Sequence, residues 1–450
     1  MDSFLSLEKL LLSRAVRFMY NDEKRIQMGS AVSQRQPREL ETRWHISVIP
    51  LYMAIGSPGL LATLVALTLG ASIAEIGAMT AAGAIATFIF SIVWGKLSDY
   101  SGIRKRYLLF FTLALGPIFL MLSLANSVQQ IIIIYTMASA ITAGVAPIAV
   151  MYTVECCRLE DWQVGVARYS SVASVGNILG LLIFTITAPF LETRWLFYIS
   201  SATCFSAALF LWVMGSEPET TLARHPFPVK NFHDAEKLLS PRPILHYLDM
   251  RRIKPPWNMR RMTPLQLLFL AAFIHWTGIS LFGVGQTPLM KDLGLTDGLI
   301  LAINVVTGVT AAIAFAWIAP RIKSSHKRSI NLIVIARCIL ILCWAALPFF
   351  LIHSIPFVFV LPLIISVAFN ILYSLIWLPI TNFAISQAPD DLKGSVQGEL
   401  LSATALAGAV GSMAGGLVMA TFGYTAGFVL ASIIALLTIP ILSKFDMSAI

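Results

Sequence analysis

Charged residues are scarce in this sequence. Asp, Glu, Lys and Arg make up 12% of the 450 residues, and hydrophobic residues make up 57%. Soluble domains carry about 25% charged residues, so this composition excludes a soluble globular protein. We predict an integral membrane protein.

Motifs of enzymes and metal sites are also missing. The sequence has no Ser/His/Asp set, no phosphate-binding loop and no dinucleotide-binding fingerprint. The five cysteines are Cys156, Cys157, Cys204, Cys338 and Cys343. Their spacing does not match that of a metal site. We therefore predict free thiols, no metal, no cofactor and no enzymatic activity.

Long apolar runs fill most of the chain. Each is longer than about 17 residues, which is enough for a helix to cross a bilayer. They cover roughly residues 46–70, 74–94, 107–125, 130–153, 166–190 and 195–214, and then 265–288, 297–319, 329–352, 355–378, 399–420 and 425–443. The pattern predicts an all-α integral membrane protein with twelve transmembrane helices in two six-helix halves.

These runs divide the chain into four predicted segments. Residues 1–44 form an N-terminal arm, 45–214 the first half, 215–262 a central loop and 263–445 the second half. The central loop is rich in proline, so we interpret it as a linker. Two interpretations of the arm are left open: a short amphipathic helix on the inner leaflet, or an over-extended gene start before Met28.

Basic residues predict the orientation. Of the 32 Lys and Arg, 29 lie in the arm, the central loop, the tail or the loops on the same side of the membrane. The three exceptions are Arg194, Lys291 and Arg337. Both termini are therefore predicted to be cytoplasmic, in a multi-pass protein of the cell membrane. The net charge of +9 reflects this bias and attraction to lipid, so the expected partner is the bilayer and not nucleic acid. Arg337 lies within the ninth run, and we expect it to snorkel toward the cytoplasmic headgroups.

One loop carries a dense motif. It runs from Gly95 to Arg106, between the second and third runs, and its motif positions are Gly95, Leu97, Ser98, Asp99, Gly102 and Arg104. The spacing resembles the loop between the second and third helices of the major facilitator superfamily, with departures at Tyr100 and Ile103. A copy from Trp317 to Arg328 keeps the cations but has lost the motif glycine and aspartate. The resemblance implies two parallel repeats with a substrate site at the midplane.

The resemblance also implies a cytoplasmic gate. In the family, the aspartate at the position of Asp99 meets the N-terminus of the eleventh helix and nearby arginines. We assign to this gate Gly95, Asp99, Gly102, Arg104, Glu155 and Arg158. The alternative is that Asp99 only caps the end of its own helix.

The central cavity of this family is surrounded by the first, fourth, seventh and tenth helices. Polar and aromatic side chains recur three or four residues apart in three of these runs, which places them on one helical face. The predicted cavity residues are Tyr135, Ser139, His275, Trp276, Gln286, Asn370, Tyr373 and Trp377. Such stripes also form hydrogen bonds between helices, which is the alternative role of each residue.

The four cavity runs hold no Asp, Glu, Lys or Arg at mid-depth. We therefore disfavour nitrate, phosphate and other small anions as substrates. His275 is the titratable residue deepest in these runs, and a neutral, hydrogen-bonded role is favoured over a proton carrier. Ala140 and Leu181 stand where proton-driven drug exporters of the family carry arginine and proline, which argues against that activity.

We predict a monomeric secondary transporter that moves a small organic solute by alternating access. Uptake of a neutral metabolite and proton-coupled export of amphipathic compounds both fit an aromatic and amide cavity, so a coupling proton is left open. The alternative from another class is a non-transporting sensor or scaffold with the same fold.

Overall fold

The computed structural model describes residues 43–157, 162–217, 263–315, 327–350, 355–387 and 393–442. Within these ranges the secondary structure is helical, with turns and short connections and no strand. The N-terminal arm, Arg158 and most of the central loop lie outside them. The side chain of Asp99 also lies outside the description, although its backbone belongs to a helix.

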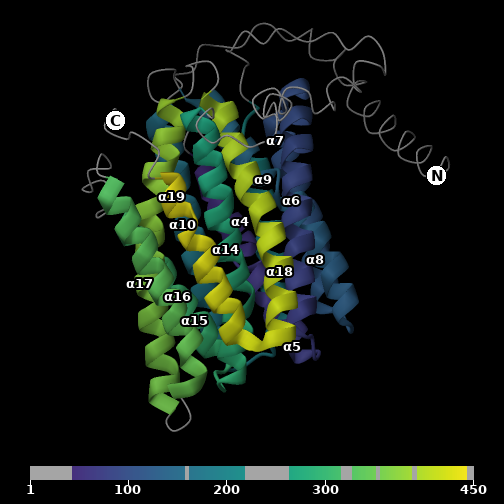
Figure 1. Cartoon of the computed structure of the whole chain (residues 1–450). Coiled ribbons are helices and arrows are strands. Elements are labelled where there is room, and N and C mark those ends of the chain that lie inside the picture. The colour runs from purple at the N-terminus through teal and green to yellow at the C-terminus, as the bar shows by residue number, and fades with distance from the viewer. Residues whose placement is uncertain are drawn as a thin grey trace, which may run out of the picture. The chain divides into compact units, whose positions relative to one another are not determined.

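The first set of helices runs from α4 to α11 (Figure 1). Their bounds are α4 His45–Ile55, α5 Pro58–Thr68, α6 Ile73–Ser101, α7 Arg104–Ser123, α8 Val128–Thr142, α9 Val145–Cys156, α10 Trp162–Thr187, the 3-10 helix η1 Thr193–Trp195 and α11 Leu196–Met214. Pro58 begins α5 directly after the break that ends α4. Proline is favoured at a first helical position because its missing N–H has no partner there in any case.

The second set runs from α14 to α19. Their bounds are α14 Pro264–Asp292, α15 Asp297–Ile313, α16 Lys327–Phe350, α17 Ile355–Ser386, α18 Lys393–Leu436 and α19 Thr438–Leu442. Gly423 interrupts α18 with a φ of 82°, a left-handed conformation that glycine adopts without strain. This residue divides α18 into two arms.

Ten helical segments of the described chain are long and apolar enough to cross a membrane, and α15, with 17 residues, is a shorter apolar helix. One span joins α4 with α5, a second joins α8 with α9, and a third covers 45 residues from Gly398 to Leu442. The all-helical prediction is confirmed for the described residues. The number twelve and the sidedness of the termini stay predictions.

The two sets meet along α6 with α18 and along α10 with α15, and Figure 1 shows α6 beside α18. Glycine allows the first of these contacts, since a Cβ on Gly77 would lie 2.7 Å from the Cα of Gly416. Below, the "cation-rich end" of the bundle is the end that holds Arg104, and the "opposite end" is the end that holds Asp297. Gly77 and Gly416 lie toward the opposite end of their helices.

Candidate functional site

The loop motif begins with a helix end that needs glycine. Helix α6 stops at Ser101, and Gly102 follows with a φ of 71° while its N–H donates to the carbonyl of Ser98. Gly95, the other glycine of the motif, does not take part in this turn. Gly95 lies inside α6, and open space surrounds the position of its missing side chain, so Gly102 alone makes the turn.

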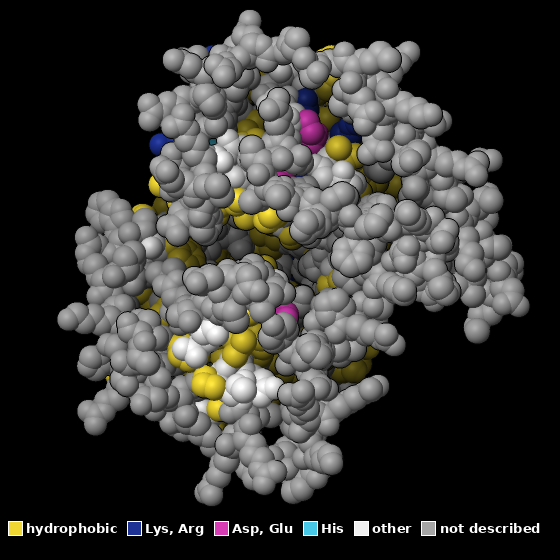
Figure 2. Space-filling view, turned by 90° about the horizontal axis from the view of Figure 1, so that it is seen from above, with side chains coloured by type: hydrophobic (Ala, Val, Ile, Leu, Met, Phe, Trp, Pro, Cys, Tyr) yellow, Lys and Arg dark blue, Asp and Glu magenta, His cyan; other side chains and the backbone are white. Residues whose placement is uncertain are grey.

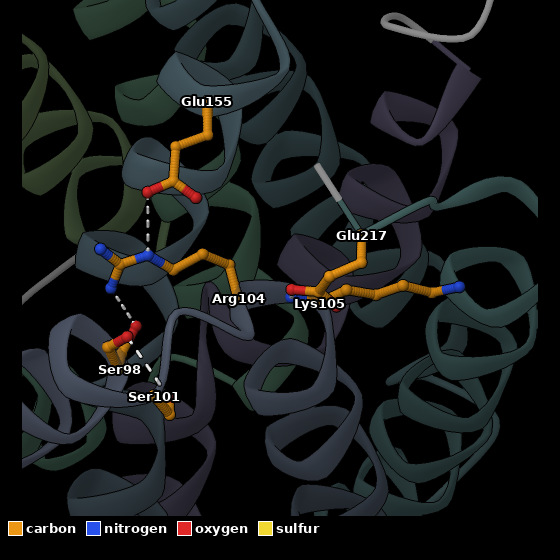
Figure 3. Close-up of polar contacts among 6 residues, drawn as sticks. All are labelled: Ser98, Ser101, Arg104, Lys105, Glu155 and Glu217. Carbon is orange, nitrogen blue, oxygen red and sulfur yellow. Dashed lines mark hydrogen bonds and ion pairs between the residues drawn. The ribbon is translucent and has the colours of Figure 1, made fainter. Parts of the chain in front are cut away.

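Arg104 links three helices of the first set (Figure 3). Its side chain is 2% exposed, its Nε donates to Glu155 Oε1 at 3.3 Å, and its Nη1 donates to the hydroxyl of Ser98. These partners come from α9 and α6, while Arg104 begins α7. The predicted gate residues Arg104 and Glu155 therefore form a buried ion pair within one set of helices.

Glu217 is a charged partner that sequence reasoning missed. Figure 3 shows Glu217 beside Lys105, and the Oε1 atom of Glu217 accepts the backbone N–H of Lys105 at 3.2 Å. The Lys105 ammonium donates to the carbonyls of Gly215 at 2.6 Å and Trp212 at 3.2 Å. Partial burial raises the pKa of Glu217, although its hydrogen bond with Lys105 and the charge of Arg106 oppose the rise. The available signal was an acidic residue that can reach the N-terminus of a helix, where negative charge is favoured.

The proposed partner of Asp99 stays a prediction. The Asp99 side chain, Arg158 and the residues just before α18 all lie outside the described residues. Viewed from above (Figure 2), acidic and basic side chains lie next to each other in one area, other charged side chains lie apart from it, and hydrophobic side chains are visible between the grey atoms.

Four aromatic side chains form a cluster in the second set, which we call the aromatic cluster: Trp276 of α14, Phe315 after α15, and Tyr373 and Trp377 of α17. The ring centroids of Trp276 and Trp377 lie 5.0 Å apart, and Tyr373 lies 6.2 Å from Trp276, 6.3 Å from Trp377 and 5.9 Å from Phe315. The structure thus brings together three predicted cavity residues. Phe315 was missed, because nothing in its own run marks which face it presents.

Arg337 is buried, so the expectation that it snorkels is wrong. Its side chain is 1% exposed, its Nη1 lies 2.8 Å from Nε2 of His275, and its guanidinium carbon lies 4.3 Å above the ring of Phe369. The same carbon lies 5.8 Å from the ring centre of Tyr373. Arg337 projects into the second set of helices toward His275 of α14, whereas snorkelling would have carried it along α16 to a headgroup.

The two predicted amides make hydrogen bonds within the second set. Gln286 Nε2 donates to Ser366 Oγ at 3.2 Å, and Asn370 Nδ2 donates to the Ser366 carbonyl at 2.9 Å. Neighbouring Ser374 donates to the carbonyl of Ala311 at 3.3 Å and so links α17 to α15. The bonds of Gln286 and Ser374 fit the alternative role, in which polar groups join helices, whereas the Asn370 bond stays within α17.

Tyr135 and Ser139 have their contacts in the first set. A Cβ on Gly83 would lie 2.6 Å from the ring of Tyr135, and one on Gly59 would lie 3.0 Å from its hydroxyl. Ser139 donates to the Tyr135 carbonyl at 2.9 Å. No ring contact joins Tyr135 to the aromatic cluster in the described part of the chain.

A charged group joins the two sets at the opposite end. The Thr193 hydroxyl and the Lys291 ammonium both donate to the carboxylate of Asp297. These residues line a hollow of about 600 Å³, to which Glu192 and Arg194 also contribute. No group of three or more His, Cys, Asp or Glu in the described residues could hold a metal ion.

Comparison with known proteins gives one relative and several structures. The lincomycin resistance protein of Streptomyces lincolnensis is 30% identical over 135 residues, which are 30% of this chain and 27% of that protein. The chain thus matches about a quarter of the length of this curated relative.

The solved structures are similar over most of their length. The human organic anion transporter MFSD10 has 18% identity and a TM-score of 0.63, with 91% of this chain and 100% of that chain covered. The POT family transporter PepTSo has 12% identity and a TM-score of 0.68, with 91% and 97% covered. The nucleoside transporter NupG has 13% identity and a TM-score of 0.64, with 90% and 100% covered.

At these identities the structures establish the fold alone. Independently of these structures, the sequence matches the family model of the Major Facilitator Superfamily over residues 45–412. This match confirms the resemblance carried by the loop between the second and third apolar runs. The protein is a multi-pass membrane protein that belongs to the Major Facilitator Superfamily.

Proposed function

We propose that this protein is a secondary transporter that moves a small organic solute across the cell membrane by alternating access. The observation that carries the proposal is the aromatic cluster, because three of its four side chains are residues predicted to line the cavity. Aromatic rings give a solute large contact areas with defined geometry. In this proposal, a ring of the solute stacks on the aromatic cluster.

The proposal includes a topology of twelve spans. The count takes α4 with α5, and α8 with α9, as one span each, takes α15 as a full span, and takes the arms of α18 on either side of Gly423 as two. The excess of Lys and Arg on one side supports cytoplasmic termini and makes the cation-rich end cytoplasmic.

The contacts between the two sets support alternating access. Gly77 with Gly416, and Thr193 with Asp297, join the two sets toward the opposite end in this conformation. Under the proposed topology that end faces outward, so the binding site would open toward the cytoplasm. In the alternate state Asp99 would close the cation-rich end.

The direct test is solute exchange in proteoliposomes. The purified protein is reconstituted, loaded with unlabelled solutes of one chemical class at a time, and tested for counterflow of a labelled member of that class. Counterflow in one class identifies a transporter and its substrate class. A folded protein that exchanges none of the sugars, nucleosides, peptides, carboxylates or hydrophobic cations would contradict the proposal and favour the sensor or scaffold.

Proton-coupled export of amphipathic compounds is the second candidate. The lincomycin resistance protein favours it, as does Glu399, a carboxylate in α18 that is 8% exposed and whose Oε2 has no hydrogen-bond partner. Ionisable groups within membrane helices commonly serve ion pathways. In this case Glu399→Gln would abolish export driven by a pH gradient and keep solute exchange, whereas unchanged gradient dependence would exclude Glu399 as the proton carrier.

A further inference from the structure

Arg337 is a positive charge in the middle of a membrane protein. It is the eleventh of the 24 residues of α16, and both it and His275 are buried, with 1% and 0% exposure. None of the ion pairs between described residues involves it. A buried charge without a carboxylate partner is strongly unfavourable, and such residues in membrane helices mark functional sites.

The hydrogen bonds of this pair leave donors unmet. Arginine only donates, so Nε2 of His275 must accept from Arg337 Nη1, and the imidazole proton must lie on Nδ1. Neither the Nε–H of Arg337 nor Nδ1 of His275 has a hydrogen-bond partner. Both unmet groups are donors, so the missing chemistry is an acceptor.

The aromatic cluster lies directly beside this charge. The ring centroid of Tyr373 lies 5.8 Å from the guanidinium carbon of Arg337. It lies 6.2 Å from the ring centroid of Trp276 and 6.3 Å from that of Trp377. Tyr373 is therefore the side chain shared by the cation and the cluster. Because Arg337 is fully covered here, a ligand would reach it only after Tyr373 or its helix moves.

We propose that Arg337 binds the carboxylate of the transported solute while the aromatic cluster binds an adjacent ring, so that the substrate class is an aromatic carboxylate. This inference rests on the proposed transport function. His275 is a positioning residue, since it accepts from Nη1 and leaves the Nε side of the guanidinium available. The planar guanidinium suits a carboxylate, which accepts two parallel hydrogen bonds. The first, fourth, seventh and tenth runs hold no cation at mid-depth, which disfavoured anions as substrates, but Arg337 enters from the ninth run.

The test compares a carboxylate with its own amide. Thermal unfolding of the purified protein is measured with indole-3-acetate, indole-3-acetamide and a panel of other aromatic acids paired with their amides. Counterflow of the same pairs is measured in proteoliposomes. The wild type should be stabilised by at least one acid and exchange it at least tenfold faster than its amide.

Arg337→Gln keeps a donor for His275 and removes the charge, so it should abolish the preference for the acid. Arg337→Lys keeps the charge without the planar group and should retain only part of the preference. Arg168→Gln, at an exposed position of α10, is the matched control and should keep the wild-type preference. If Arg337→Gln does not fold, the test rests on the acid-to-amide exchange ratios of Arg337→Lys and of the wild type.

An equal acid-to-amide ratio in the wild type and Arg337→Gln would overturn the inference. So would a wild type that exchanges other solutes and prefers no acid over its amide. Stabilisation by an acid without exchange of any solute would instead contradict the transport function and leave the binding site in place.

Discussion

Two arginines are buried in the described helices, and their surroundings differ. Arg104 donates to a carboxylate and a hydroxyl, whereas Arg337 donates to a neutral imidazole and lies against aromatic rings. Arg104 lies at the end of its helix, and Arg337 lies at mid-depth. Arg104 with its carboxylate partner joins three helices, whereas Arg337 has no such partner among the described ion pairs, and this difference is why we propose that Arg337 binds an anion.

The largest loss of stability is expected when Arg104 loses its carboxylate partner Glu155. Glu155→Ala removes the carboxylate that accepts from the buried Arg104 guanidinium at 3.3 Å, so we expect a loss of up to about 3–5 kcal/mol in the free energy of unfolding. Chemical denaturation in detergent would measure it. The double variant Arg104→Met/Glu155→Leu should recover much of the loss, because both charges of the buried pair are then removed together. A single variant as stable as the wild type would show that the pair has no structural role.

The second prediction concerns Asp99, which shares its loop with Arg104. If Asp99 closes the cation-rich end, Asp99→Asn should shift the population of conformations about tenfold, or about 1.4 kcal/mol, toward the state open at that end. Reporter cysteines at Gln387 and Gly298, in a variant without native cysteines, would measure it through their labelling rates.

Labelling should become faster at Gln387 of the cation-rich end and slower at Gly298 of the opposite end. Equal rates with and without the substitution would mean that Asp99 only caps its own helix. The matched control is Ser101→Ala, which removes a hydroxyl from the same turn without changing its charge.

Arg337→Gln should have a much smaller effect on stability than Glu155→Ala. Removing the buried charge removes its cost of desolvation, and this gain offsets the weaker hydrogen bond to His275. The free energy of unfolding should therefore change by less than about 2 kcal/mol. The same denaturation experiment applies. A loss as large as that of Glu155→Ala would assign Arg337 a structural role and remove the difference between the two arginines.

The smallest effect is expected at Glu217. Its pKa in the folded protein is raised, so the folded state binds the proton more tightly than the unfolded chain does. Its contribution to stability should therefore fall as the pH rises from the ordinary pKa of 4.5 toward the raised value. Glu217→Gln keeps the oxygen that accepts from Lys105 and should remove this fall, which amounts to less than about 1 kcal/mol. Identical pH profiles would contradict the prediction.

Much of the fold could be predicted because each span must satisfy its own backbone hydrogen bonds, which makes long apolar runs helical. The family could be predicted because its loop motif contains residues with clear roles. Gly102 ends α6 with a positive φ, and Arg104 is buried against Glu155. Arg337 was misjudged for a physical reason. A sequence places an arginine on a helix but does not show which neighbour its face meets, and here His275 of another helix determines its position.

Glu217 shows a second limit. It lies in a stretch interpreted as linker, and its partner Lys105 is more than a hundred residues earlier in the chain. The aromatic cluster was easier to predict, since Tyr373 and Trp377 lie one turn apart on one helix and Trp276 directly follows His275 of the polar face in the seventh run.

The central claim is that the aromatic cluster binds the transported solute. The most direct measurement is counterflow of the identified solute by Trp377→Ala and by Trp212→Ala, which removes the same side chain from an exposed position of α11. Loss of a ring contact worth about 1–1.5 kcal/mol, together with its buried area, should slow exchange by about tenfold or more at limiting solute concentration. We expect this loss in Trp377→Ala and wild-type exchange in Trp212→Ala at equal folded yield. Wild-type exchange by Trp377→Ala would place the binding site elsewhere.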